Sequence, residues 1–250
     1  TGIRQTAGTI AHRTDAATAL PLTASVSGTG DIVLDRANGS LQLRSGGTAA
    51  GGMQVTSAQG IEIASGQTLT VNGAATLSAT GGSSSIVLAG SLRAESASIS
   101  TEGGDITQTG GTIAHVTAGS EMTLAVNGTG TATVDLTAAG NGVFALANST
   151  APGGFALSGS AIRLAGYLIA GDSALTATGG ALSLGGDIRV TSLALTAATG
   201  ISQTAGNIEH RDNSTTALPL SVSVTGTGDV ALGQTNGTLQ LLAGGTAAEA

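Results

Sequence analysis

The 250-residue sequence predicts an all-β chain folded as a parallel β-helix, a solenoid with about 20 residues per coil. Three observations support this fold class. Short runs of alternating apolar and polar residues end at glycine-containing turns, long stretches of sequence repeat, and aromatic residues are limited to two Phe and one Tyr. Because 40% of the residues are still hydrophobic, we expect a narrow core of Val, Ile, Leu and Ala.

The predicted strands follow one another along the whole chain, separated by turns with Gly-Gly, Asn-Gly or Gly-Asp pairs. Alternation of apolar and small polar residues is the pattern of a strand with one buried face. No window shows an apolar stripe of helical periodicity, so helix should be minor or missing. The predicted strands cover residues 22–28, 31–37, 40–45, 53–57, 61–65, 68–73, 85–90, 121–128, 131–140, 142–148, 161–166, 174–180, 181–186 and 221–226.

A long internal repeat organises these strands. Residues 2–50 return at 200–248 with roughly 31 of 49 positions identical, and a shorter echo lies at 104–130. A sandwich or a barrel would not ordinarily repeat in this way within a continuous rhythm of strands, whereas a solenoid does.

The repeat also predicts the organisation of the chain. The motif I-x-Q-T-x-G-x-I begins at Ile3, Ile106 and Ile201, at intervals of 103 and 95 residues. Each interval would hold about five coils, and the chain roughly 12. We predict one continuous solenoid segment of a longer chain, with units at approximately 2–103, 104–199 and, in part, 200–250.

Composition argues against several classes of function. The net charge is −7 and the eight basic residues, all Arg, are scattered singly, so no electrostatic footprint for nucleic acid is present. The absence of Cys excludes disulfides and thiolate metal sites. No apolar run is long enough to span a bilayer.

The I-x-Q-T-x-G-x-I repeats, together with the S-L-x-L, A-L-T-A-T-G-G and G-D-I segments, resemble the β-strand-repeat regions of filamentous-haemagglutinin-like exoproteins. The resemblance implies a secreted bacterial surface protein, an adhesin shaft of the two-partner-secretion or autotransporter type. It further implies a right-handed β-helix and export through an outer-membrane transporter. The family's N-terminal secretion domain with its Asn-Pro-Asn-Leu signature is missing from this sequence, as is Arg-Gly-Asp.

Histidine and glutamine recur at equivalent positions of the repeats. Copies about five coils apart would be separated by roughly 24 Å, too far to share a metal ion. We therefore predict that the histidines cap turns and that the glutamine side chains bond to backbone groups at the corners. The residues are His12, His115, His210, Gln5, Gln108 and Gln203.

The carboxylates suggest an enzyme only weakly. Asp31 and Asp35 are four residues apart on one predicted strand, beside Arg36, as acids and a base could be in a β-helix enzyme acting on polysaccharides. In the second copy Asp229 matches the first acid, but Gly and Gln replace the other two residues. No G-x-S-x-G motif is present. An Asp that follows Gly is expected to close a turn by bonding its own backbone.

Three further motifs are similar to calcium-binding, ice-binding and glycosylation sequences. The stretch G-T-G-D-I-V-L-D-R is faintly similar to the calcium nonapeptide, but it recurs after 198 residues rather than nine, so calcium binding is not expected. Paired threonines could bind ice, but they recur at no fixed short interval and suit soluble strands. Asn-X-Ser/Thr sequons, mostly turn chemistry with glycosylation as an alternative, lie at Asn38, Asn127, Asn148, Asn213 and Asn236.

These observations predict a structural protein, with no enzymatic activity and no catalytic, cofactor-binding or metal site. We expect a secreted extracellular fibre or adhesin shaft of a bacterial surface or biofilm matrix, acting as a stiff scaffold. Expected partners are other copies, associating end to end or laterally, and a host-surface or glycan ligand. The alternatives are a β-helix passenger that binds or cleaves glycans, and an ice- or surface-binding solenoid.

Overall fold

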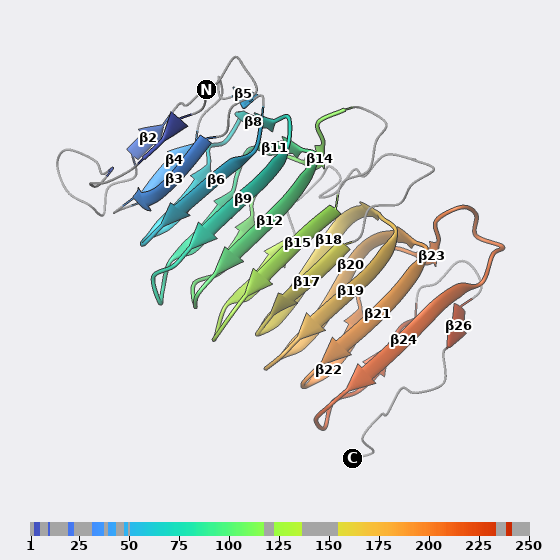
Figure 1. The fold of residues 1–250 in the computed structure, drawn as a ribbon. Coiled ribbons are helices and arrows are strands. Elements are labelled where there is room, and N and C mark those ends of the chain that lie inside the picture. Colours follow the sequence, from blue (N-terminus) through green and yellow to red (C-terminus); the bar gives the residue numbers. More distant parts are fainter. Residues whose placement is uncertain are drawn as a thin grey trace.

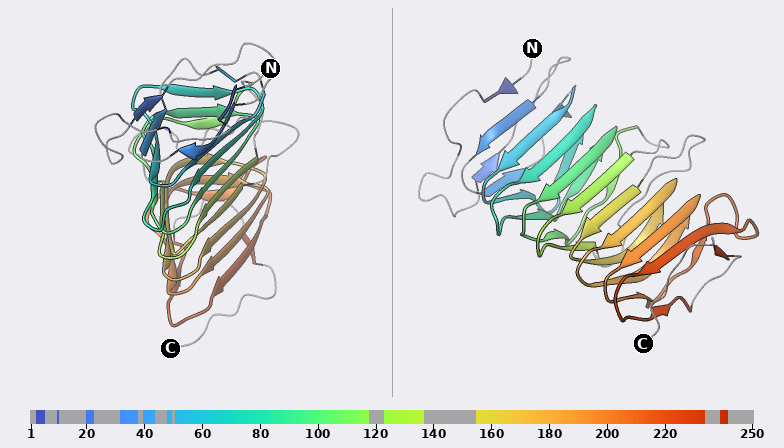
Figure 2. Two further views of the ribbon diagram at one scale, coloured as in Figure 1. Left: turned by 60° about the vertical axis from the view of Figure 1, so that its left-hand side comes forward. Right: turned by 60° about the horizontal axis from the view of Figure 1, so that its bottom comes forward.

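The computed structural model shows strands stacked along one axis, with β1 and β26 at opposite ends (Figures 1 and 2). It describes residues 3–5, 10, 20–22, 32–37, 40–43, 48–49, 51–117, 123–136, 155–233 and 239–241. Within these ranges the regular elements are all strands and none is a helix, which confirms the all-β prediction. Accordingly, no helix long and apolar enough to cross a membrane occurs in the described ranges.

The strands form two long sheets and a shorter third one, each parallel throughout. Sheet A contains β1 (Ile3–Arg4), β3 (Ile32–Ala37), β6 (Met53–Ser57), β9 (Ala74–Ala79), β12 (Ser96–Thr101), β15 (Thr123–Gly128), β17 (Phe155–Gly159), β19 (Asp172–Ala177), β21 (Ser192–Ala197), β24 (Leu218–Val224) and β26 (Leu239–Leu241). Sheet B contains β2 (Leu20–Leu22), β4 (Ser40–Leu43), β7 (Gly60–Ile63), β10 (Ser85–Leu88), β13 (Ile106–Gln108), β16 (Thr133–Leu136), β18 (Ala161–Ile169), β20 (Ala181–Val190), β22 (Gly200–Gln203) and β25 (Val230–Ala231). Sheet C contains β5 (Thr48–Ala49), β8 (Thr68–Val71), β11 (Ser91–Ala94) and β14 (Ile113–His115), and β23 (Ile208–His210) pairs with the end of β20.

The order of the strands defines a parallel β-helix. The chain passes from sheet A to sheet B to sheet C and then returns to sheet A one layer further along, as β9, β10, β11 and β12 do. Each strand therefore pairs with the strand one coil away, and the fold class predicted from the sequence is confirmed.

The length of one coil is not constant at the predicted 20 residues. The step from Phe155 to its partner Ser173 takes 18 residues, whereas the step from Leu124 to Phe155 takes 31. Four steps, rather than five, lead from Ile106 to Ile201. The coil therefore averages about 24 residues over this interval because some corners carry insertions.

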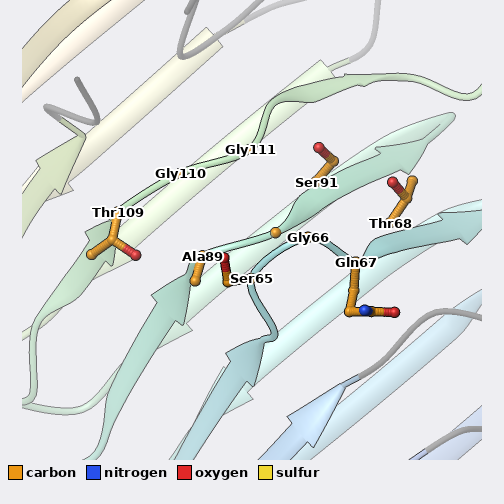
Figure 3. Close-up of a pocket in the computed structure, with 10 residues that line it drawn as sticks. Ser65, Gly66, Gln67, Thr68, Ala89, Ser91, Thr109, Gly110 and Gly111 are labelled. Atoms are coloured by element: carbon orange, nitrogen blue, oxygen red, sulfur yellow. The ribbon is translucent and has the colours of Figure 1, made fainter. Parts of the chain in front are cut away.

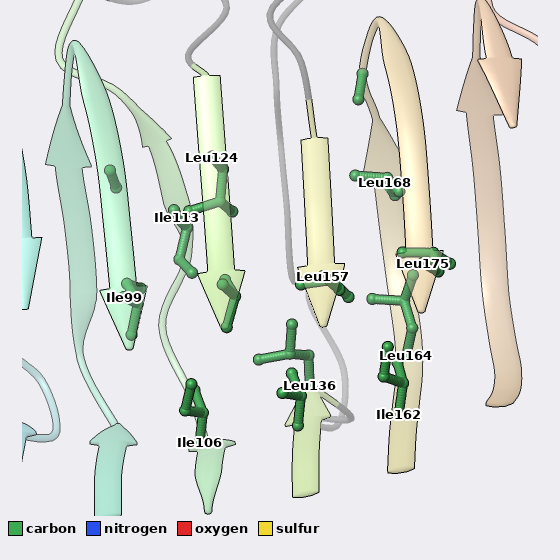
Figure 4. Close-up of a cluster of buried hydrophobic side chains, with 14 of the residues drawn as sticks. Ile99, Ile106, Ile113, Leu124, Leu136, Leu157, Ile162, Leu164, Leu168 and Leu175 are labelled. Atoms are coloured by element: carbon green, nitrogen blue, oxygen red, sulfur yellow. The ribbon is translucent and has the colours of Figure 1, made fainter. Parts of the chain in front are cut away.

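The core is made of aliphatic side chains aligned in columns along the axis (Figure 4). Every second residue of a strand points inward, so the parallel register places each buried residue over a like residue of the next coil. The buried hydrophobic residues of the described ranges are Val, Ile, Leu, Ala and one Met, as predicted. One such column in sheet B consists of Ile61, Ile86, Ile106, Val134, Ile162, Leu182 and Ile201, each at most 2% exposed.

The two long copies of the repeat lie on different sheets. Ile3 pairs with Ile32 in sheet A, but the equivalent residues Ile201 and Val230 pair in sheet B. Conversely, β2 pairs with β4 in sheet B, and the equivalent β24 and β26 pair in sheet A. The repeat thus preserves which residues pair between coils, but not the face on which they pair.

Glycine is required where the repeat motif turns from one sheet to the next. Gly111 and Gly206 occupy equivalent positions with φ of 64° and 77°, in the left-handed region. A Cβ on Gly111 would lie 2.2 Å from the carbonyl oxygen of Gly90, and one on Gly206 would lie 2.3 Å from that of Gly186. Both glycines therefore combine an unusual backbone conformation with direct contact to the preceding coil.

We predict that Gly206→Ala lowers the free energy of unfolding by about 3 kcal/mol, because it adds backbone strain to a clash with the neighbouring coil. Urea unfolding measures the loss. Gly82→Ala is the control: a Cβ there meets nothing within 4 Å, so a change within about 0.5 kcal/mol is expected. Equal effects of the two substitutions would contradict this account of the corner.

Candidate functional site

The outer surface of sheet A carries two columns of small, uncharged residues. We call this surface face A and define it by these two columns, which cross the eight strands from β6 to β24. Along the register, one column contains Gln54, Thr76, Ser98, Ala125, Ala156, Ala174, Ala194 and Ser221. The other contains Thr56, Ser78, Ser100, Asn127, Ser158, Thr176, Thr196 and Ser223.

Face A presents hydroxyl groups in place of charge. All residues of the second column carry a hydroxyl or an amide, and neither column contains an ionisable side chain. Neighbouring coils are about 4.8 Å apart, so the eight strands extend for about 34 Å. Successive hydroxyls can bond to one another, as Ser100 Oγ does to Ser78 Oγ at 3.3 Å. Face A is therefore long, neutral and free of large side chains.

Two ion pairs that join neighbouring coils lie outside sheet A. Arg163 and Asp135 are register partners in sheet B, with Nη1 3.6 Å from Oδ2. Arg189 and Glu209 are register partners at the sheet C side of the stack, with Nε 2.5 Å from Oε1. The more exposed pair, Arg163 with Asp135, stabilises the stack by about 0.2–1 kcal/mol. Glu209 is buried, so its pairing with Arg189 offsets the cost of removing its carboxylate from water. Both pairs leave face A as the neutral side of an acidic chain.

A shallow groove of about 380 Å³ follows the corner between sheets B and C across three coils (Figure 3). Glycines such as Gly90 and Gly110 keep this corner narrow, because a Cβ on either would contact backbone of the preceding coil. The groove offers the hydroxyls of Ser65, Ser91 and Thr109, and none of its lining residues is charged or aromatic. For the alternative prediction of a glycan-binding solenoid, these hydroxyl groups are available as hydrogen-bond partners of a sugar.

The histidines of the repeat cap turns, as predicted. Nδ1 of His115 accepts the backbone N–H of Thr117 at 2.9 Å, and Nδ1 of His210 accepts that of Asp212 at 3.2 Å. Each imidazole thus closes the turn that follows its strand. His12 lies outside the described residues.

The repeated glutamines bond to corner backbone, also as predicted. Nε2 of Gln108 donates to the carbonyl oxygens of Gly110 and Gly111 at 3.3 and 3.1 Å. Nε2 of Gln203 donates to the carbonyl oxygen of Gly206 at 2.8 Å. These two side chains are buried within the corner, so their amides replace water as partners of the turn.

The aspartates that follow glycine act between coils, and our prediction that they bond their own backbone was wrong for three of them. Oδ1 of Asp105 accepts the backbone N–H of Thr133 at 2.8 Å, and Oδ1 of Asp187 accepts that of Asn207 at 2.8 Å. The third, Asp172, accepts hydroxyl groups of the next coil. Each of these three carboxylates therefore joins its coil to the following coil.

The predicted pair of acids falls in an irregular stretch. Asp35 and Arg36 lie on β3, where the register with β6 shifts between Leu34 and Ala37. Asp31 lies outside the described residues, and Asp229 is exposed. In the described ranges no group of three or more His, Asp or Glu side chains is arranged to hold a metal ion.

Comparison with known proteins identifies no relative: no family model, no curated protein and no solved structure matches the chain. The resemblance to filamentous-haemagglutinin-like exoproteins therefore stays a prediction.

Sequence reasoning missed the two columns of face A and the aspartate bonds between coils. The available signal was the repeated pattern of two small or polar residues separated by one larger apolar residue within each strand. Its spacing along the chain is irregular, for example 31 residues from Asn127 to Ser158 and 18 from Ser158 to Thr176. A search at fixed intervals therefore could not align the columns.

Asp172 should make the stability of the stack depend on pH. Its Oδ1 accepts the hydroxyls of Ser192 at 2.7 Å and Thr191 at 2.9 Å, and these hydrogen bonds hold the pKa of Asp172 below its ordinary value of 3.8. Because its folded-state pKa is lowered, this contribution is present above the ordinary value and is lost as pH falls through the folded-state pKa.

We predict that Asp172→Ala lowers the free energy of unfolding at neutral pH by about 0.5 kcal/mol, since the carboxylate is exposed. The difference from the unsubstituted chain should shrink as the pH falls below 3.8, in thermal unfolding followed by circular dichroism. Asp229→Ala is the matched control, because Asp229 also follows glycine but uses its carbonyl oxygen to bond the neighbouring coil. A difference that does not vary with pH would argue against the assignment.

Proposed function

We propose that the chain is a structural rod, part of an extracellular fibre or adhesin shaft of a bacterial surface or biofilm matrix. The observation that supports this most is the continuity of the stack: sheet A joins eleven strands and sheet B ten, with adjacent strands in each paired by backbone hydrogen bonds. A load along the axis is then shared by many parallel hydrogen bonds and by the aliphatic columns, so the rod is stiff.

The side chains of the described ranges support the same role. The carboxylates of Asp105, Asp172 and Asp187 and the ion pairs of Arg163 and Arg189 all connect one coil to the next. These five charged groups are thus engaged within the stack. This distribution favours a scaffold over a catalytic passenger.

Electron microscopy of the native material, undenatured, tests the proposal. We expect filaments on the cell surface or in the matrix that bind antibodies against this chain and show a stacking repeat of about 4.8 Å along the axis. Sheet A alone should account for about 48 Å of filament, from ten steps between eleven strands. Antibody label restricted to the cell interior, or to isolated particles, would count against a structural role.

Lateral association should use face A. Two acidic rods repel each other least where neither carries charge, and small side chains allow two sheets to approach closely. The two columns of face A carry no charge and consist mostly of Ala, Ser and Thr, so they meet both conditions.

We predict that Thr176→Arg reduces the association of rods, measured as a drop in light scattering or bundle width at concentrations where the unsubstituted chain associates. Ser202→Arg places the same charge on the outer surface of sheet B, between the uncharged register partners Ser183 and Ala231, and should leave association unchanged. Both residues are half-buried strand positions, which makes the comparison fair. Equal reduction by the two substitutions would show that the position of the new side chain does not matter, which would contradict the role of face A.

A further inference from the structure

The loop between β23 and β24 places one asparagine apart from the body of the stack. It covers residues 211–217, and its tip projects beyond the strands (Figure 1, orange). Asp212 to Thr216 are all exposed. The stem is anchored, because the backbone N–H of Arg211 donates to the carbonyl oxygen of Val190 at 3.0 Å and the His210 imidazole accepts that of Asp212. An exposed tip on a fixed stem is accessible to another protein without unfolding of the solenoid.

The tip is shaped by the side chain of Asn213. Its Oδ1 accepts the backbone N–H groups of Thr215 and Thr216 at 3.0 and 2.8 Å, and their hydroxyls at 2.7 and 3.0 Å. Backbone N–H groups can only donate, so the atom that faces them must be the oxygen of the carboxamide. Nδ2 therefore points away from the turn, and in the described part of the chain it makes no hydrogen bond.

We propose that Asn213 is an acceptor site for an N-linked sugar. Asn213, Ser214 and Thr215 form an Asn-X-Thr sequon in a surface loop. The structure adds two features that the sequence motif lacks: the Thr215 hydroxyl already bonds to the Asn213 carboxamide, and the hydrogen bonds of the turn engage only the oxygen of this exposed residue. The assignment is independent of the structural role proposed above.

The chemistry is a glycosyl transfer from an activated donor, catalysed by a separate glycosyltransferase. Nδ2 attacks the anomeric carbon of a sugar phosphate or diphosphate, a C–N bond forms, and the C–O bond to the phosphate group breaks. Nδ2 loses one proton, and the phosphate group departs with the bonding electron pair. No atom is oxidised or reduced.

The turn by itself does not require asparagine. In the first copy of the repeat Asp15 stands at the position of Asn213, and an aspartate side chain can accept the same backbone N–H groups. What asparagine adds is the amide nitrogen. The sequon is also confined to this copy, because the middle copy has no Asn between His115 and Glu121.

A second described sequon provides an internal contrast. Asn127 lies on β15, between its register partners Ser100 and Ser158 in the interior of sheet A. The hydroxyl of its Thr129 donates to the carbonyl oxygen of Thr101 at 3.1 Å and so is not turned toward Asn127. To enter the cleft of a transferase, this sequon would have to leave the sheet. We therefore expect Asn127 to stay unmodified in the folded chain.

Peptide mapping by mass spectrometry of the protein isolated from its own source tests the assignment. We expect hexose or N-acetylhexosamine on Asn213 and none on Asn127. Asn213→Gln and Thr215→Val, expressed in the same source, should both abolish the modification, and Asn127→Gln should leave it unchanged. Both substituted loop residues are exposed, and unchanged circular dichroism would confirm that each variant folds.

A reconstituted reaction tests whether the folded loop itself is a substrate, independently of the enzymes present in the source cells. The folded recombinant chain and a synthetic peptide of residues 211–217 are incubated with UDP-glucose and an asparagine glycosyltransferase specific for Asn-X-Ser/Thr. Glucose on Asn213 of the folded chain supports the proposal. An unmodified Asn213 in the native protein, or in the folded chain when the peptide is modified, overturns it.

Discussion

The parallel register between successive coils is the constraint on which the rest of this structure depends. Once Ile106 pairs with Val134, and Val134 with Ile162, the inward residues must form columns and the outward residues must form columns as well. The core, face A and the aspartate contacts are three results of this alignment. Each would be lost by a slip of one residue, because such a slip turns every inward side chain outward.

Much of the fold could be predicted because its signals are local. Alternation within each run indicates a strand, the scarcity of aromatic residues indicates a narrow core, and the repeated motif marks equivalent corners, where His115 and Gln108 bond as expected. The length of a coil could not be predicted in the same way. Insertions at the corners change the distance along the chain without changing the pairing, as in the long step from Leu124 to Phe155.

The candidate surface depends on partners that are distant in the sequence, which is why it was missed. Asp105 follows a glycine and therefore resembles a turn residue, yet its carboxylate bonds to Thr133, 28 residues away. The hydroxyls of Ser78 and Ser100 become neighbours only when β9 and β12 are in register. Local patterns identify which side chains point outward, but only the stacking of coils shows which of them are adjacent.

The two long copies of the repeat place equivalent strands on different sheets, and so on different sides of the stack. Because β1 and β3 lie in sheet A and their equivalents β22 and β25 in sheet B, equivalent residues of the two copies point in different directions from the axis. Duplication of such a unit therefore repeats a surface residue on another side of the stack as well as further along its axis. A stack built in this way presents equivalent residues to more than one side of its axis.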